Sequence, residues 1–175
     1  YAEVIGAQNI KDGNESTYAT LKAKTVAAVV TKNGEAWVQT NFDQKIPIGT
    51  TSYVKVSKVT AGGASLDLGG VLGGLLGLLG DKIFVEAYAN AEDGSPIAGT
   101  NLKTTFVETK SGDLLLAITS KVPYEGIRVK LRSEASALNL LGSKNYEMNV
   151  YEAFYYTGEA SCGKPLATGV GSVGL

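Results

Sequence analysis

The sequence predicts an all-β fold, an antiparallel β-sandwich or barrel, from three observations. Several short segments alternate apolar and polar residues with a period of two, as strands with one wet face do. No segment of about ten residues or more has the period of an amphipathic helix, and glycine accounts for 22 of the 175 residues, which indicates many turns. About six to eight strands without the spacing of βαβ units favour antiparallel sheets.

The first predicted element is a hairpin formed by residues 27–32 and 35–39. Asn33-Gly34 lies between these segments, and this dipeptide favours a type I′ turn because both central residues need positive φ. In that register Trp37, the only tryptophan, lies opposite an apolar residue of the first segment. Trp37 is therefore predicted to be a core residue and not a platform for a sugar.

The clearest strand covers residues 127–132, in which apolar and basic residues alternate strictly. A strand with one dry and one wet face requires this pattern, so both faces can be assigned. Ile127, Val129 and Leu131 are predicted to face the core, and Arg128, Lys130 and Arg132 to face water. The other predicted elements are strands over 52–59, 82–90 and 148–156, and a hairpin at Ser111-Gly112 that places Val107 opposite Leu116 and Lys110 opposite Asp113.

One segment, 68–80, departs from the strand pattern because it consists only of leucine, glycine and valine. The uncharged run of 13 residues lies between Asp67 and Asp81, whereas a helix needs about 20 residues to span a bilayer. We therefore expect no membrane insertion. The two interpretations left open are a loop or short helical turn packed over an open end of the sandwich and an exposed apolar patch for a partner.

The chain length predicts one domain, over residues 1–158. Residues 159–175 are rich in glycine and serine and have the composition of a linker or tail. The sequence begins at Tyr1 without a methionine or a charged and apolar leader, so we expect a processed product or, preferably, a piece of a longer chain. Cys162, the single cysteine, is expected to be a free thiol or to bridge to a neighbouring domain.

Composition argues against several function classes. The 16 basic and 17 acidic residues leave no excess positive charge for binding nucleic acid. Histidine is absent, which makes zinc and copper sites improbable. The G-x-G-x-x-G spacing at 169–174 has no helix after it, as a dinucleotide site requires. No pair of carboxylates with the arrangement of a glycosidase stands out, so the sequence predicts a protein that is not an enzyme.

Two distant segments contain the candidate site residues. The first is the turn cluster that begins with Asp12-Gly13-Asn14 and continues to Thr17. The second is the last predicted strand, where alternation places Glu152 on the same face as three apolar residues. A carboxylate on a dry face needs a cation or a paired charge. The alternative is that this face of the strand is the wet one.

Together these two segments resemble the discoidin or coagulation-factor 5/8 type C domains and related carbohydrate-binding modules. The resemblance rests on Asp12-Gly13-Asn14-x-Ser16-Thr17-Tyr18 and Val150-x-Glu152-Ala153-Phe154-Tyr155. Those domains are jelly-roll sandwiches in which the first long loop and the last strand share a structural calcium ion. The resemblance implies that the ligands of such an ion are Asn9, Asp12, Asn14, Thr17, Tyr151 and Glu152, an all-oxygen set that suits calcium.

A resemblance over most of the chain is to modules of very large secreted surface adhesins of the Bacteroidota. It rests on the first loop, on the segment from Trp37 to Pro47, on the Leu/Gly-rich segment and on Tyr151–Gly158. It implies a non-enzymatic, extracellular module exported to the cell surface by type IX secretion, with neighbouring domains in a larger chain.

Two functions remain open from the sequence. The first is a calcium-stabilised adhesion module that binds a glycan or another surface. The second is a purely structural spacer or filament element of a multidomain surface protein. Loop aromatics would favour glycan binding, and Tyr124 is the only aromatic residue that the sequence places off a confident strand.

Overall fold

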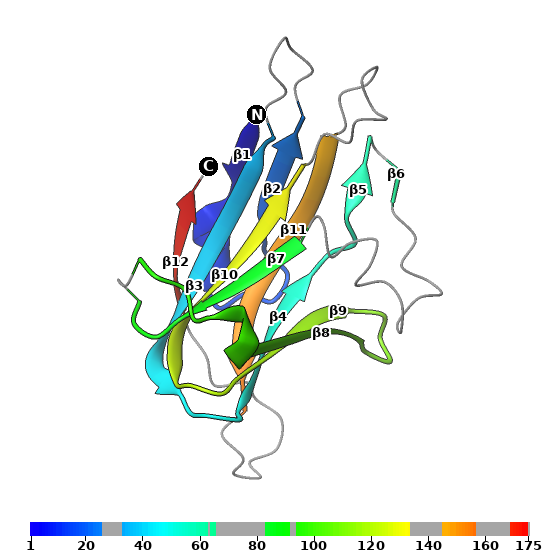
Figure 1. Cartoon of the computed structure of the whole chain (residues 1–175). Helices are drawn as coiled ribbons and strands as arrows, with labels where there is room; N and C mark the ends of the chain where they lie inside the picture. Colours follow the sequence, from blue (N-terminus) through cyan, green and yellow to red (C-terminus); the bar gives the residue numbers. More distant parts are fainter. Residues whose placement is uncertain are drawn as a thin grey trace.

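The protein is a sandwich of two antiparallel β-sheets (Figure 1). The computed structural model describes residues 1–25, 33–62, 64–65, 83–91, 94–133, 145–156 and 169–174. None of the helices within these residues is long and apolar enough to cross a membrane. The all-β sandwich predicted from strand alternation is confirmed.

The larger sheet contains both segments of the candidate site. Its strands lie in the order β1 (Ala2–Ile5), β2 (Ala19–Lys24), β11 (Asn145–Tyr155), β4 (Thr51–Val56), β9 (Leu114–Ser120) and β8 (Leu102–Glu108). Of two further short strands, β5 (Thr60–Ala61) pairs with β11, and β6 (Ala64–Ser65) pairs with β5.

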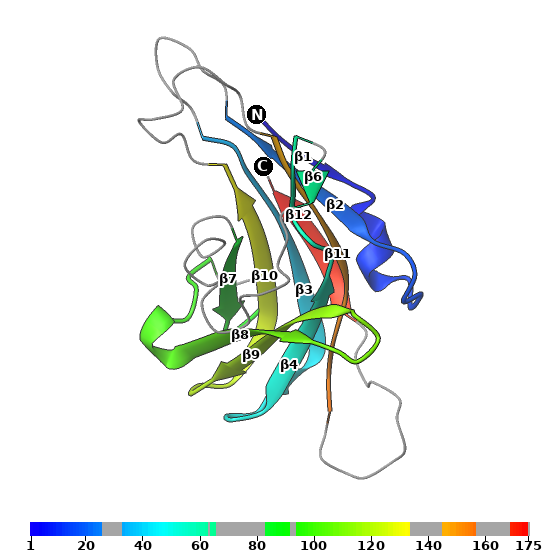
Figure 2. The same ribbon diagram turned by 90° about the vertical axis from the view of Figure 1, so that its right-hand side faces the viewer.

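The smaller sheet lies opposite and includes the longest strand (Figure 2). Between these sheets the chain crosses repeatedly, from β2 to β3 and from β3 to β4, so residues far apart in sequence meet in the core. The strand order of the smaller sheet is β12 (Gly169–Gly174), β3 (Glu35–Ile46), β10 (Tyr124–Arg132) and β7 (Ile83–Tyr88). The described helices are the 3₁₀ turns η1 (Ala7–Lys11) and η2 (Gly99–Asn101).

Strand β10 has the two faces that its alternation predicts. Ile127, Val129 and Leu131 are at most 2% exposed and lie in the core. The three basic residues of β10 are on the outer face, where they pair with carboxylates of the neighbouring strands. Strand β10 is longer than predicted and begins at Tyr124, which is fully buried. The expectation that Tyr124 is a loop aromatic available to a sugar is therefore wrong.

Trp37 lies on the outer face of the smaller sheet, and its prediction as a core residue is also wrong. Its neighbours Ala36 and Val38 are buried, so alternation directs Trp37 outward. The guanidinium carbon of Arg128 lies 3.8 Å from the centre of the Trp37 ring and 4.6 Å from the centre of the Tyr88 ring. The tryptophan is half-buried because it covers a cation and not because it fills the core.

Gly34 does not form the type I′ turn expected at Asn33-Gly34. Its φ is outside the left-handed region, and its N–H and carbonyl exchange hydrogen bonds with the Oγ and N–H of Ser133, at 3.0 and 2.8 Å. A Cβ on Gly34 would collide with the carbonyl of Tyr1 and would lie 2.9 Å from that of Lys24. Glycine is required at this position because the backbone of Tyr1 and Lys24 leaves no space for a side chain. The first partner of the predicted hairpin, 27–32, lies outside the described residues.

The hairpin predicted at Ser111-Gly112 forms between β8 and β9, but its register differs by one residue. Val107 lies opposite Leu115 and not Leu116. Thr109 pairs with Asp113, and Gly112 has a φ of 85°. The connection is thus a three-residue loop with a left-handed glycine, a common hairpin alternative that contains one more residue than the predicted turn.

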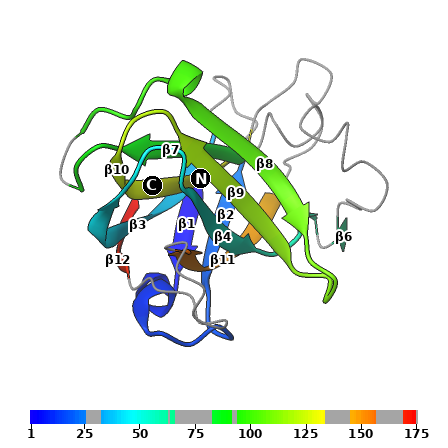
Figure 3. The ribbon, with the colours of Figure 1, turned by 90° about the horizontal axis from the view of Figure 1, so that it is seen from below.

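Part of the predicted linker over 159–175 forms a strand. Gly169–Gly174, the segment with the G-x-G-x-x-G spacing, pairs with β3 as β12 and lies beside η1 (Figure 3). Backbone hydrogen bonds do not depend on side chains, so a sequence of glycine and serine can pair as an edge strand where a partner is provided. The Leu/Gly-rich segment and Cys162 lie outside the described residues.

Candidate metal centre

The loop between η1 and β2 is organised by its own short polar side chains. The N–H of Asn14 donates to Oδ1 of Asp12 at 2.9 Å, and the N–H of Ser16 donates to Oδ1 of Asn14 at 3.0 Å. Gly13 supports the first turn with a φ of 70°. The side-chain amide of Asn9 donates to the carbonyl of Tyr18 at 3.0 Å, which closes the loop onto the start of β2.

Four acceptor oxygens surround the hydroxyl of Thr17. Its Oγ1 lies 2.8 Å from each carboxylate oxygen of Asp12, 2.9 Å from the carbonyl of Asn14 and 3.2 Å from the carbonyl of Asn9. A hydroxyl has one hydrogen to donate, so it cannot satisfy four acceptors. The cluster is therefore a concentration of negative potential that a cation would relieve.

Strand β11 contains a β-bulge where it passes this loop. Val150 lies opposite Val56 and Ala153 opposite Val54, so Tyr151 and Glu152 together face the single residue Lys55 of β4. A bulge shifts the alternation by one residue. The prediction that Glu152 shares a buried face with Met148 and Val150 is therefore wrong: Met148, Val150 and Ala153 are buried, whereas Glu152 and Phe154 are half-buried.

The bulge brings Glu152 into the electrostatic field of the loop. Burial raises the pKa of Glu152 above its ordinary value of 4.5, and the carboxylates of Glu15 and Asp12 raise it further. The ammonium of Lys55 acts in the opposite direction. The negative charges of the first loop thus disfavour the ionised form of Glu152 on the last long strand.

The six residues of the predicted ligand set are thus placed as follows. Asn9, Asp12, Asn14 and Thr17 converge on one point, and Glu152 is close enough to Asp12 to feel its charge. Tyr151 contacts the loop through its ring, 5.2 Å from the ring of Tyr18.

Sequence reasoning missed two charged neighbours of this site, Glu15 and Lys55. Glu15 is part of the same loop and could have been included on that ground. Lys55 could not, because its position depends on the β4–β11 register. Its ammonium pairs with Asp113 at 3.0 Å and lies 5.2 Å from the Tyr151 ring, beside the bulge.

The donor chemistry fits a hard cation. The cluster supplies a carboxylate, a hydroxyl and two carbonyls, the ligand types that calcium prefers. Glu152 would have to approach this cluster to add a second carboxylate. Within the described ranges, no three acidic, cysteine or histidine side chains gather into a metal-binding group. Backbone and hydroxyl oxygens would therefore have to make up most of the coordination shell.

No family model, curated protein or solved structure matches the chain. The oxygen cluster and the bulge beside it are therefore the observations on which a functional assignment rests.

Proposed function

We propose that the chain is a non-enzymatic adhesion module of a large extracellular surface protein, stabilised by calcium. The observation that supports this most directly is the hydroxyl of Thr17 with four acceptor oxygens within 3.2 Å. The resemblance of both segments to discoidin-like jelly-roll domains supports the same function. Glu152 would complete the site from the neighbouring strand.

In this proposal the ion is structural. It would neutralise Asp12, Glu15 and Glu152, whose mutual repulsion otherwise opposes their approach. It would also tie the loop before β2 to the bulge in β11. With carbonyl, hydroxyl and carboxylate oxygens filling the shell, the site would offer little room for a reacting water.

Thermal unfolding with and without calcium tests the proposal. Free calcium at about 100 times its dissociation constant should stabilise the protein by about 2.7 kcal/mol relative to EDTA. Glu152→Gln should weaken this response because it removes a charged ligand, whereas Glu108→Gln, an exposed change on β8, should leave it unchanged. Equal melting temperatures in calcium and EDTA for the unmodified protein would refute a calcium site.

A second candidate function, a spacer or filament element, is favoured by one observation. Tyr53, Phe154 and Tyr156 form an aromatic cluster on the larger sheet, with ring centres 5.5 to 6.2 Å apart, and Tyr156 is 54% exposed. A neighbouring domain or subunit could cover such a cluster. If this is its role, the protein should self-associate with increasing concentration in sedimentation experiments, and Phe154→Ser should abolish the association.

A further inference from the structure

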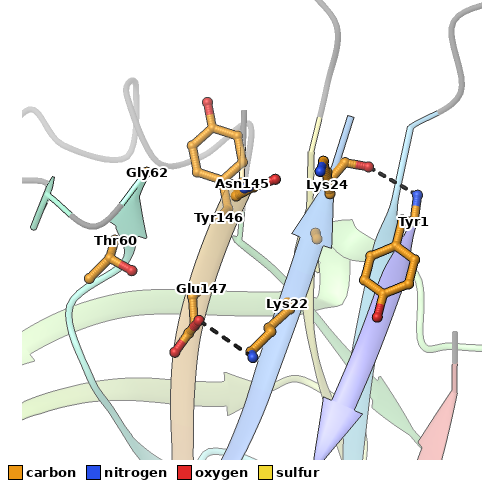
Figure 4. Close-up of a pocket in the computed structure, with 9 residues that line it drawn as sticks. Tyr1, Lys22, Lys24, Thr60, Gly62, Asn145, Tyr146 and Glu147 are labelled. Atoms are coloured by element: carbon orange, nitrogen blue, oxygen red, sulfur yellow. Dashed lines mark hydrogen bonds and ion pairs between the residues drawn. The ribbon is translucent and has the colours of Figure 1, made fainter. Parts of the chain in front are cut away.

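A polar pocket lies on the outer face of the larger sheet, where β1, β2, β11 and β5 lie side by side (Figure 4). Its volume is about 630 Å³. The strand register explains its lining: Lys24 lies opposite Asn145, Lys22 opposite Glu147, and Glu147 opposite Thr60, so their side chains project from one face in adjacent rows. The ring of Tyr1 forms one wall.

The charged groups at the pocket are Lys22, Lys24 and Glu147 in its lining and Glu3 beside Lys22. The ammonium of Lys22 lies 3.9 Å from a carboxylate oxygen of Glu3 and 3.9 Å from one of Glu147, so it forms two long ion pairs. The ammonium of Lys24 has no ion pair with any carboxylate in the described part of the chain. A ligand with a negative charge would provide its missing partner.

The remaining lining groups suit a ligand that is rich in hydroxyls. Thr60, Asn145 and Glu147 offer hydroxyl, amide and carboxylate groups, which together donate and accept hydrogen bonds. Tyr1 is 61% exposed, and its backbone is fixed by two hydrogen bonds with Lys24, at 2.8 and 3.0 Å. A fixed, exposed ring beside polar groups can stack against the apolar C–H face of a sugar.

We propose that this pocket is a subsite for a saccharide unit that bears a carboxylate. The carboxylate pairs with Lys24, the sugar hydroxyls bond to Thr60, Asn145 and Glu147, and the ring stacks on Tyr1. The inference rests on the proposed adhesion function and names its ligand class and binding surface. A neutral sugar would leave the charge of Lys24 without a partner, and a small inorganic anion would not use the ring of Tyr1.

The test uses the full chain in calcium and three matched pairs of probes. These are the methyl glycosides of galacturonate, glucuronate and N-acetylneuraminate, each compared with its own methyl ester, which keeps the ring but removes the charge. Binding is followed by titration of the backbone amide resonances of Lys24, Asn145 and Glu147. At least one acid should bind about fivefold more tightly than its ester, the factor expected of an exposed ion pair.

Three variants assign the effect to the pocket. Lys24→Met should reduce the affinity for the acid to that for the ester, and Lys24→Arg should restore the difference because it keeps the charge. Lys103→Met removes an exposed lysine on β8 and should change nothing. Melting curves of each variant confirm that it is folded.

Several outcomes would overturn the subsite. These are equal affinities of acid and ester for all three pairs, no binding of any probe, an acid preference that persists in Lys24→Met, and binding that is lost in Phe154→Ser instead. The result is independent of the calcium test. A calcium-dependent melt without acid preference removes only the subsite, whereas a Lys24-dependent preference with identical melts removes only the calcium site.

Discussion

Gly34 occupies a position where the backbone leaves no space for a side chain. The carbonyls of Tyr1 and Lys24 approach it from the larger sheet, while Ser133 pairs with it at the end of β10. Gly34→Ala should therefore lower the free energy of unfolding by about 1–3 kcal/mol or more, because backbone atoms have to move. Gly99→Ala is the matched control, since no atom lies within 4 Å of its added Cβ. Equal denaturation midpoints of the two variants in urea would contradict this account.

Glu152 makes the stability of the calcium-free protein depend on pH. Its pKa is raised in the folded state, so around and above pH 4.5 this carboxyl keeps its proton more often in the folded protein than in the unfolded chain. In EDTA the contribution of Glu152 to stability should therefore be most favourable at acidic pH and should be lost as pH rises through its raised pKa, whereas Glu86 and Asp113, whose pKa values are lowered, act in the opposite direction. Glu152→Gln removes this titration, so the variant should be more stable than the unmodified protein at neutral pH in EDTA.

Melting temperatures measured in EDTA from acidic to neutral pH would check this expectation. Calcium should reverse the order of the two proteins at neutral pH, because the ion favours the ionised carboxylate. A variant that is less stable than the unmodified protein in EDTA at neutral pH would show that Glu152 is not repelled by its neighbours.

At the scale of elements, Arg128 joins three strands of the smaller sheet. Its guanidinium lies between the rings of Trp37 and Tyr88 and donates from Nε and Nη2 to Oε1 of Gln39, at 3.1 and 2.9 Å. Lysine lacks the planar group that both contacts require. Arg128→Lys should destabilise the protein by about 1–2 kcal/mol in urea titrations. Arg132→Lys loses stacking on the single ring of Phe84 and the paired hydrogen bonds to Glu35, but lysine keeps a cation beside that carboxylate. It should therefore cost less than Arg128→Lys, which leaves the buried amide of Gln39 without this donor, and the opposite order would contradict this role.

The elements also show what alternation can and cannot predict. It assigned both faces of β10 correctly because the strand is regular over residues 127–132, and the irregularity in its pairing with β3 lies before them, between Tyr124 and Gly126. It assigned the face of Glu152 incorrectly because the bulge depends on the register with β4, which lies far away in sequence. Sequence reasoning also placed Trp37 in the core. An aromatic residue in a strand looks the same in the sequence whether it is buried in the core or covers a basic residue of the neighbouring strand. Strand β12 was missed because its composition is that of a linker.

For the whole molecule, buried tyrosines predict a loss of stability in alkali. Burial, followed by the hydrogen bond to Glu86, raises the pKa of Tyr88 to about 12. Burial also raises the pKa of Tyr124 and of Tyr146. Raised folded-state values mean that the folded protein keeps these protons longer than the unfolded chain does. The stability from Tyr88 should thus be complete below pH 10.0 and be lost as pH rises toward about 12.

Urea midpoints across the alkaline range would measure this loss. Tyr88→Phe should flatten the decline, because phenylalanine does not titrate, although the variant also loses the hydrogen bond to Glu86 at every pH. An unchanged alkaline slope in this variant would place the cause elsewhere.

The architecture of the molecule could be predicted from local patterns, but the contents of its site could be predicted only in part. Asp12, Asn14 and Thr17 converge because the turn chemistry that brings them together is local. The arrival of Glu152 and Lys55 depends on β11 and β4 being neighbours, and the pocket depends on four strands from distant parts of the chain. Pairing between such segments is a property of the whole fold.

The position of Trp37 equips the protein with two separate optical reporters. The only tryptophan lies on the smaller sheet beside Arg128, whereas Tyr18 and Tyr151 lie at the candidate metal centre and Tyr53 lies on β4 of the larger sheet. Tryptophan fluorescence therefore follows the smaller sheet, whereas the near-ultraviolet dichroism of tyrosine reports on both sheets, because Tyr88 and Tyr124 lie on β7 and β10. If the sandwich unfolds in a single cooperative step, the two signals must change together at every denaturant concentration. A calcium-dependent gap between them would reveal a layer that can open while its partner stays folded.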